Sequence, residues 1–374
     1  MLRPRCIQVL LAFMMAASGL TLACRTLPDQ SVTLKDTVLS LGDPGHQELA
    51  AECTGVWTLF LSPKRHDLLN DIEITSGAVG PNIPGSPASL ETHGQWFIEY
   101  QRRGAQIVLA GLCLKDPEYL NLALSIFKWG FDRQAADGSF AGSGAVFHST
   151  TFFVEAVAHS ILMVRASDDV STEIKAKFDA MIPPLSRAAA WMIKPEVLLP
   201  GLEGNEAFTH RCLLIADGLG LTSLLITDQR LAGYLRATAS QQISEALDSQ
   251  RPDGVAPEKG GYDSSYQTVG MGFAAVWWLY FQNDPLASAV KGFLDKGLTW
   301  EMSRVLPTGE VDKTGNTRVT GVGEVGRTGK PKDIDYPRVA HALGIWGALS
   351  GNHEMSAVAK KVCHFKYPDR CPRT

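Results

Sequence analysis

The stretch that decides the fold runs from Asp253 to Gln267 and reads DGVAPEKGGYDSSYQ. An earlier stretch, Asp137–Phe153, reads DGSFAGSGAVFHSTTFF and aligns with it when one gap is allowed. In that alignment Phe147–Ser149 falls on Tyr262–Ser264. Each stretch begins with an Asp-Gly turn and continues into an aromatic helix, so the two indicate one structural unit that is used more than once.

A weaker third copy begins at Pro307–Glu310 and resumes at Asp335–Arg338. In each copy the polar residues lie where a loop becomes a helix. Ser264 and Gln267 are spaced as a capping box, Ser149 is the matching cap in the first copy, and Pro337 suits a first helical turn. The repeats therefore predict that these helix starts lie together at one mouth of the molecule.

Helical periodicity covers most of the chain, and little alternating strand pattern is present. Helices are expected over Glu48–Leu61, His93–Cys113, Pro117–Arg133, Ser149–Val164, Thr172–Ile193, Asn205–Leu225, Gln229–Leu247, Ser264–Tyr280, Pro285–Val305, Tyr336–Leu349 and His353–Cys363. Some are apolar all round and others have a polar face, which indicates inner helices covered by outer ones. We expect an all-α fold, an α/α toroid built as an incomplete barrel of about eleven to twelve helices. An open helical solenoid is the alternative.

Composition fits one large globular domain. The chain has 374 residues, of which 45% are hydrophobic, and a formal net charge of -4. A net negative chain has no basic field for nucleic acid, so we expect no nucleic-acid partner. An anionic substrate would need a local cluster of cations.

The N-terminus has the pattern of a secretion signal. Arg3 and Arg5 precede a short apolar run, and Leu20–Cys24 is similar to a bacterial lipoprotein cleavage site. We expect a signal peptide over 1–23, a tether over 24–45 and a single toroid domain over 46–374. The mature protein would be periplasmic, anchored to the outer membrane or secreted, with lipid on Cys24 as its only membrane link; ordinary signal cleavage is the alternative.

An oxidising compartment permits disulfides among the remaining cysteines. Cys363 and Cys371 are close in sequence, which makes them the best candidate pair. Cys113 and Cys212 lie in apolar helical patterns and are expected to be buried thiols. No pair has the Cys/His spacing of a zinc site, so we expect neither metal nor cofactor.

Candidate catalytic residues gather at the predicted helix starts. Tyr262 and Tyr266 are four residues apart, and the positive end of a helix favours a phenolate. His148 lies one residue before its predicted cap. His210 and Arg211 begin an apolar run, and Arg211 either pairs with a carboxylate, Glu206 or Asp217, or faces the mouth, because an unpaired buried guanidinium is costly.

Candidate substrate-binding residues lie nearby. The segment 306–333 is a long glycine-rich loop of the kind that covers binding sites. Its cations would close over an anion, and amides and an aromatic ring at other helix starts would contact a sugar. These candidates are Arg318, Arg327 and Lys330 in the loop, and Gln95, Trp96, Asn205 and Gln267 elsewhere. For Trp96, core packing is the competing interpretation.

This set of side chains suits β-elimination from a uronic acid sugar. Neutralising the carboxylate by hydrogen bonds and charge makes the C5 proton acidic. A His or an ionised Tyr removes that proton, and a Tyr protonates the leaving glycosidic oxygen. A free Tyr has a pKa near 10, so a neighbouring cation must lower the pKa of the phenol if it is to act as the base.

The stretches Tyr262–Gln267, Phe147–Ser149 and Thr209–Arg211 make the chain resemble the α/α-toroid polysaccharide lyases, which include alginate, glucuronan and chondroitin lyases. The resemblance covers roughly residues 90–350 through short motifs. It implies an anionic polysaccharide or oligosaccharide substrate, with the acid or base role falling on Tyr266 or Tyr262 and on His148 or His210. It also implies that Asn205 or Gln267 neutralises the carboxylate and that Arg211 assists. The C-terminal β-sandwich of many larger members is absent, so the polymer cannot be carried over.

Two other functions compete with the lyase interpretation. A toroidal glycoside hydrolase, such as an unsaturated glucuronyl hydrolase, needs carboxylates as acid and base. Its candidates here are Asp137, Asp253, Asp263 and Glu206, although Asp137 and Asp253 also suit plain turns. A sugar-binding lipoprotein without catalysis would use the same aromatic mouth.

Overall fold

Helices make up most of the described chain. The computed structural model describes residues 43–54, 69–85, 95–205, 207–321, 323–326 and 330–368. Within these ranges the backbone forms helices and isolated β-bridges but no β-strand, which confirms the all-α class. The predicted signal peptide, Cys24 and the tether up to residue 42 lie outside the described ranges. From Pro44 onward the described residues belong to one compact unit.

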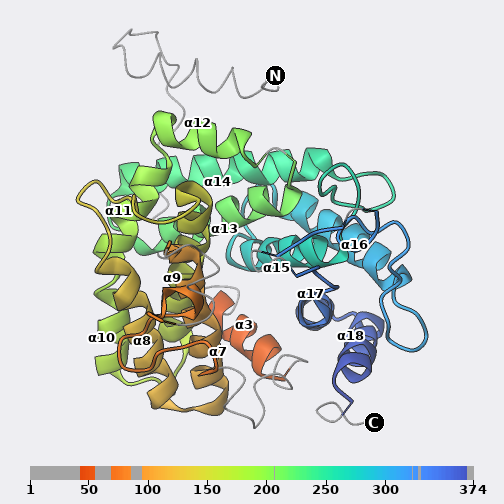
Figure 1. Cartoon of the computed structure of the whole chain (residues 1–374), viewed down its shortest axis with the longest axis horizontal. Coiled ribbons are helices and arrows are strands. Elements are labelled where there is room, and N and C mark those ends of the chain that lie inside the picture. The colour runs from red at the N-terminus through yellow and green to blue at the C-terminus, as the bar shows by residue number, and fades with distance from the viewer. Residues whose placement is uncertain are drawn as a thin grey trace, which may run out of the picture. The chain divides into compact units, whose positions relative to one another are not determined.

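The elements follow one another along the chain, and the long loop lies between α16 and α17 (Figure 1). They are α3 (Pro44–Thr54), η2 (Gly80–Asn82), η3 (Ile98–Arg102), α7 (Arg103–Leu114), α8 (Pro117–Phe131), α9 (Val146–Ala166), α10 (Thr172–Asp179), α11 (Ile182–Met192), α12 (Pro195–Glu203), α13 (Thr209–Leu225), α14 (Gln229–Ser249), α15 (Ser264–Tyr280), α16 (Ala287–Ser303), α17 (Tyr336–Ser350) and α18 (His353–Lys366). The 3-10 helices are η2 and η3, and the others are α-helices. Most of the predicted helices are present with ends within three residues of those expected.

Four predicted helices differ from the structure, and prolines explain one of them. The helix expected from Glu48 begins earlier, as α3 at Pro44, and its expected end at Leu61 lies outside the described residues. The range Thr172–Ile193 splits into α10 and α11, because Pro183 and Pro184 lack the N–H groups that a continuous helix would need there. The helix expected from His93 is preceded by η3 and begins as α7 only at Arg103. The helix expected from Asn205 begins at Thr209, so Asn205 lies in the connection after α12.

The helices pack mainly against their neighbours in the chain. Helices α7, α9, α13, α15 and α17 contact one another in that order. Beside them lie α8 on α7, α14 on α13, α16 on α15 and α18 on α17 (Figure 1). Helix α3 contacts α7 and α9 as well as α15 and α17, so it packs between the early and the late helices. This is the hairpin pattern that the repeats predict, and closure into a complete toroid stays a prediction.

Helix α9 lies in the core. It is long and apolar enough to cross a membrane by length and composition, with a mean hydropathy of 1.2, but 67% of that window is buried inside the protein. Its Phe153 ring makes edge-to-face contacts with Phe127 of α8 and with Phe140 in the loop that precedes α9. Burial on all sides explains why the sequence of α9 has so narrow a polar face.

The turn that begins each repeat is present four times. Gly138 and Gly254 are the predicted copies, Gly309 belongs to the weaker third copy, and Gly77 marks a fourth that the sequence did not reveal. All four have positive φ, between 77° and 98°. A Cβ at Gly138, Gly254, Gly309 and Gly77 would overlap the carbonyl oxygens of Arg187, Lys296, Lys361 and Ser125, respectively. Glycine is therefore required both by the turn and by its contact with an outer helix.

Disulfides differ from the expectation in one respect. Cys113, expected to be a buried thiol, is bonded to Cys53, so α7 is covalently joined to α3. The sequence gave no spacing signal for this pair, whose members are 60 residues apart. Cys363 is disulfide-bonded, and its predicted partner Cys371 lies outside the described residues. Cys212 forms no disulfide and is half-buried.

Candidate functional site

Three neighbouring inner helices bring their first turns together. His148 lies in the first turn of α9, His210 is the second residue of α13, and Tyr266 is the third residue of α15. The caps differ from the expectation. Asp263, not Ser264, caps α15 by accepting hydrogen bonds from two backbone N–H groups. Ala145 in a left-handed conformation precedes α9, and no side chain caps that helix.

Tyr266 is held between an imidazole and a guanidinium. Its ring stacks on that of His210, with 4.4 Å between centroids and 6° between planes. The guanidinium carbon of Arg318 lies 4.4 Å from the centroid of the Tyr266 ring. A guanidinium over the ring must lie on the face that His210 leaves open. Arg318 is itself fixed by Asp263, with 3.0 Å between Nε and Oδ1. We call Tyr266 and the side chains around it the Tyr266 cluster; they are His210, Arg211, Glu258, Lys259, Arg318, Glu324 and Lys332.

The hydroxyl of Tyr266 is engaged with charged groups from the long loop. It donates to Oε1 of Glu324 at 2.7 Å and accepts from Nζ of Lys332 at 3.2 Å. Partial burial and the hydrogen bond to Glu324 raise the pKa of Tyr266. The expectation that a neighbouring cation lowers the pKa of this phenol is therefore wrong, because the carboxylate and burial outweigh Arg318. Tyr266 is a neutral proton donor in this arrangement.

His210 is buried and oriented by Glu258. Its backbone N–H donates to Oε1 of Glu258 at 2.9 Å, and its Nδ1 lies 2.8 Å from Oε2. Burial and the charge of Arg211 lower the pKa of His210 to about 3, so the imidazole is neutral at neutral pH. Burial also raises the pKa of Glu258. Because Nδ1 of the neutral ring is held by Glu258, Nε2 is the ring nitrogen that is left to act on a substrate.

Arg211 lies at the side of the cluster and has no carboxylate partner within hydrogen-bonding distance among the described residues. Its Nη1 donates to Oδ1 of Asn205 at 2.8 Å and to the carbonyl of Gly204 at 3.3 Å. Its guanidinium lies 3.9 Å from the centroid of the Phe208 ring. Of the two predicted alternatives, pairing with Asp217 does not occur, and Glu206 lies outside the described residues. The positive charge of Arg211 is therefore not neutralised by a hydrogen-bonded carboxylate of the described residues, and it lies at the side of the Tyr266 cluster.

His148 completes the set on the α9 side. Its ring makes an edge contact with Phe152, at 4.9 Å between centroids. Burial and the nearby charge of Arg211 lower the pKa of His148 to about 3. Its Nδ1 is buried and has no hydrogen-bond partner among the described residues. The structure therefore brings His148, His210, Arg211 and Tyr266 into one neighbourhood.

Other predicted site residues have different surroundings. Tyr262 lies before α15, packs on Trp300, and binds Arg304 and the carbonyl of Thr314. Gln267 is buried, and its amide bonds to the backbone at Ala256 and Gly297. Neither residue can therefore take the role expected for it without giving up these contacts.

The structure does not link the remaining binding candidates to the Tyr266 cluster. Trp96 packs against Trp129, which supports the core-packing interpretation. Gln95 and Lys330 are exposed, and no side-chain contact links them to the Tyr266 cluster in the described part of the chain. Arg327 lies outside the described residues.

Four residues of the Tyr266 cluster were not among the site residues predicted from the sequence. They are Glu258, Lys259, Glu324 and Lys332. Glu258 and Lys259 lie inside the second repeat, between its turn and its helix, where the first repeat has no charged residue. Lys259 also has a positive φ of 54°, a strained conformation that is common near functional sites. That difference between the two copies was the available signal.

A second polar group is buried further along the same helices. We call it the Glu48 cluster: Glu48, Glu155, His159, Asp217 and Tyr280. His159 Nε2 lies 2.5 Å from Oε1 of Glu48, whose Oε2 accepts from the Tyr280 hydroxyl at 2.9 Å. Both carboxylate oxygens of Asp217 are buried without a hydrogen-bond partner among the described residues. Burial and the charge of Glu155 raise the pKa of Asp217 well above its usual value.

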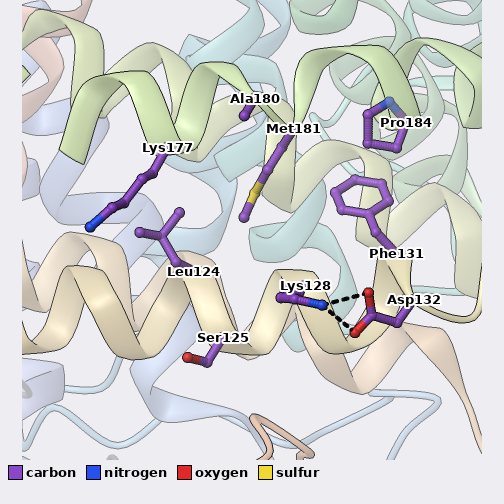
Figure 2. Close-up of a pocket in the computed structure, with 9 residues that line it drawn as sticks. All are labelled: Leu124, Ser125, Lys128, Phe131, Asp132, Lys177, Ala180, Met181 and Pro184. Atoms are coloured by element: carbon purple, nitrogen blue, oxygen red, sulfur yellow. Dashed lines mark hydrogen bonds and ion pairs between the residues drawn. The ribbon is translucent and has the colours of Figure 1, made fainter. Parts of the chain in front are cut away.

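A separate cavity of about 440 Å³ lies between α8 and the α10–α11 segment (Figure 2). Its lining is mainly apolar and includes Leu124, Phe131 and Met181. Lys128 and Asp132 on its edge bind each other, at 2.7 Å (Figure 2). None of its lining residues belongs to the Tyr266 cluster, so the chemistry argued below does not involve this cavity.

Comparison with known proteins does not assign this chain to a family. Comparison of the chain with protein-family models, with curated proteins and with solved structures found no match.

Proposed function

We propose that this protein is a lyase that cleaves a uronic-acid-containing polysaccharide by β-elimination. The observation that carries the proposal is the stacked pair of Tyr266 and His210, with Arg318 on the open face of the phenol. A neutral acid, a neutral base and several cations then lie within one small region. This is the set of groups that removal of a proton next to a carboxylate requires.

The reaction needs two proton transfers and one charge neutralisation. The base takes the proton from C5 of the uronate, the C4–oxygen bond breaks, and a double bond forms between C4 and C5. The acid gives its proton to the departing glycosidic oxygen. Cations and hydrogen-bond donors at the carboxylate stabilise the charge that builds up on it during proton removal.

Tyr266 suits the role of the acid. Its raised pKa keeps the hydroxyl protonated at neutral pH, so it can donate but cannot begin as a phenolate base. His210 suits the role of the base, because it is neutral and lies against the same phenol. When the proton shared with Glu258 is on Nδ1, Nε2 of His210 has a free lone pair to accept the C5 proton.

Substrate contacts come from the Arg211 side. Arg211 and Asn205 present a guanidinium and an amide that are already joined to each other at 2.8 Å. The unpartnered Nδ1 of His148 offers a further hydrogen bond to a sugar hydroxyl in this neighbourhood. We assign these three residues to binding the sugar around the reacting carbon.

The contacts of the carboxylates disfavour the hydrolase alternative. Asp137 accepts from the N–H of Ser139 within its turn, and Asp253 does the same for Val255. Asp263 caps α15 and holds Arg318. A hydrolase needs two carboxyl groups that face one glycosidic bond from opposite sides. The carboxylates of Asp137, Asp253 and Asp263 instead accept hydrogen bonds within turns, at a helix cap and from Arg318.

The experiment is an assay of the mature protein on a panel of uronic-acid polysaccharides. β-Elimination gives a product with a conjugated double bond, which is followed by its near-ultraviolet absorbance. Reducing ends that appear without that absorbance would replace the proposal with hydrolysis. Binding to a polymer with neither signal would replace it with the non-catalytic alternative.

A further inference from the structure

Glu324 brings a carboxylate from the long loop into the centre of the Tyr266 cluster. Its Oε1 accepts from the Tyr266 hydroxyl at 2.7 Å and from Nζ of Lys332 at 2.6 Å. Its Oε2 lies 3.5 Å from Nζ of Lys259, beyond a close hydrogen bond, and no other described group donates to it. Three cations and a phenol thus surround one carboxylate of the chain itself.

Charge explains why this carboxylate stays there. Partial burial alone would raise the pKa of Glu324, but Lys332, Tyr266 and Arg318 lower the pKa to about 2. The group is therefore an anion at every pH at which the protein would be assayed. A site that holds one carboxylate so strongly has the chemistry to hold another.

We propose that Lys259, Arg318 and Lys332 form a binding site for a sugar carboxylate beside Tyr266, and that Glu324 fills this site when no substrate is bound. The proposal rests on the lyase function for its choice of ligand, a uronate. A substrate carboxylate enters by displacing Glu324, so the loop carboxylate competes with the substrate.

The binding site would persist after Glu324 leaves, because most of its parts are held from elsewhere. Arg318 is fixed by its ion pair with Asp263 at 3.0 Å. The backbone N–H of Lys259 donates to the carbonyl of Ala207 at 2.8 Å. Two backbone hydrogen bonds join the site to Glu324 itself: the N–H of Lys332 donates to the Glu324 carbonyl at 2.8 Å, and the N–H of Glu324 donates to the Arg318 carbonyl at 2.7 Å.

Displacement also frees the proposed acid. While Glu324 is in place, the hydroxyl of Tyr266 donates to that carboxylate and cannot donate to a leaving oxygen. Arrival of the uronate would therefore bind the substrate and release the phenol in one step. The cost is a lower apparent affinity, since only the fraction of molecules with Glu324 displaced can bind.

The test measures binding of a monomeric uronic acid, glucuronate, by titration calorimetry. Glu324→Gln keeps the shape of the side chain and removes its charge. We expect this variant to bind glucuronate at least about tenfold more tightly than the wild-type protein. Glucose, which lacks the carboxylate, should show no such gain. Glu310→Gln, a charge change in the same loop outside the site, should leave glucuronate binding unchanged.

Two outcomes would overturn the inference. One is that Glu324→Gln binds glucuronate no more tightly than the wild type while its thermal unfolding is unchanged, which would leave Glu324 as a brace for Tyr266 only. The other is that adding Lys332→Met to Glu324→Gln fails to weaken glucuronate binding. A monosaccharide has no glycosidic bond to eliminate, so these results are independent of whether the lyase proposal holds.

Discussion

The Tyr266 cluster with the neighbouring His148 and the Glu48 cluster both use residues of α9, α13 and α15, yet their surroundings differ. Helix α9 supplies His148 to one region and His159 to the other; α13 supplies His210 and Asp217. In the first region the charged groups meet at helix starts, close to the exposed Lys259. In the second region, the side chains of Glu48 and Asp217 are completely buried, and the Asp217 carboxylate has no hydrogen-bond partner among the described residues. The contrast suggests that the first region carries chemistry and the second sets stability.

The largest effect is expected from the phenol of the first region. Tyr266→Phe removes the proposed proton donor and should lower the elimination rate by about 10²- to 10⁴-fold. Tyr262→Phe is the matched control, because it removes the same atom from a residue that contacts Arg304 and the loop carbonyl of Thr314 instead. Initial rates of double-bond formation measure both. Equal rates in the two variants would remove Tyr266 from the reaction.

A pair of histidine variants tests directly whether the first region carries the chemistry and the second sets stability. His210→Gln should lower the rate by about 10²-fold with little change in thermal unfolding, because it removes the base. His159→Gln leaves the buried Glu48 without its cation and should lower the free energy of unfolding by about 3–5 kcal/mol. Rates and thermal unfolding are measured for both. If His159→Gln lost activity at a temperature where it is fully folded, the two regions would not be separable in this way.

A smaller effect concerns the pH dependence of stability. The pKa of Asp217 is raised in the folded protein, so folding binds a proton at this group, and stability should fall as pH rises above about 4 toward the folded pKa. The pKa of His159 is also raised, because Glu48 and Glu155 outweigh burial. Its contribution is complete below about pH 6.5 and is lost as pH rises through the folded value.

Asp217→Asn removes the first of these titrations. The variant should be more stable than the wild type at pH 8 by about 1–3 kcal/mol, with a smaller gain at pH 5. Denaturant unfolding at the two pH values measures the difference. A variant that is destabilised equally at both values would show that the Asp217 carboxyl group contributes a favourable contact rather than a buried cost.

The helices could be predicted because their signal is local. Apolar residues recur every three to four positions along α14, α15 and α18, and these helices begin at the residues expected. Prolines at 183 and 184 gave a local sign of the break between α10 and α11, which the longer periodic pattern concealed. The repeats also placed His148 and Tyr266 at equivalent helix starts, and the apolar run after Arg211 placed His210 at the start of another helix.

The partners of those residues could not be predicted, because they are distant in sequence. Tyr266 meets Glu324 across 58 residues, and Tyr280 meets Glu48 across 232. No periodicity links such pairs, and their meeting depends on how the helices pack. The pKa of Tyr266 shows the consequence. Helix position and cations suggested a lowered value, whereas an unforeseen carboxylate from the loop raises it.

The bond between Cys53 and Cys113 has a practical consequence for making the protein. It closes a loop of 60 residues, and a cross-link of that span is worth about 4 kcal/mol by restricting the unfolded chain. Helix α3 contacts α15 and α17, which are synthesised last, so its docking must wait for the end of translation. A recombinant product from a reducing cytosol would lack the covalent link that keeps α3 near α7, and oxidative refolding or export should recover it.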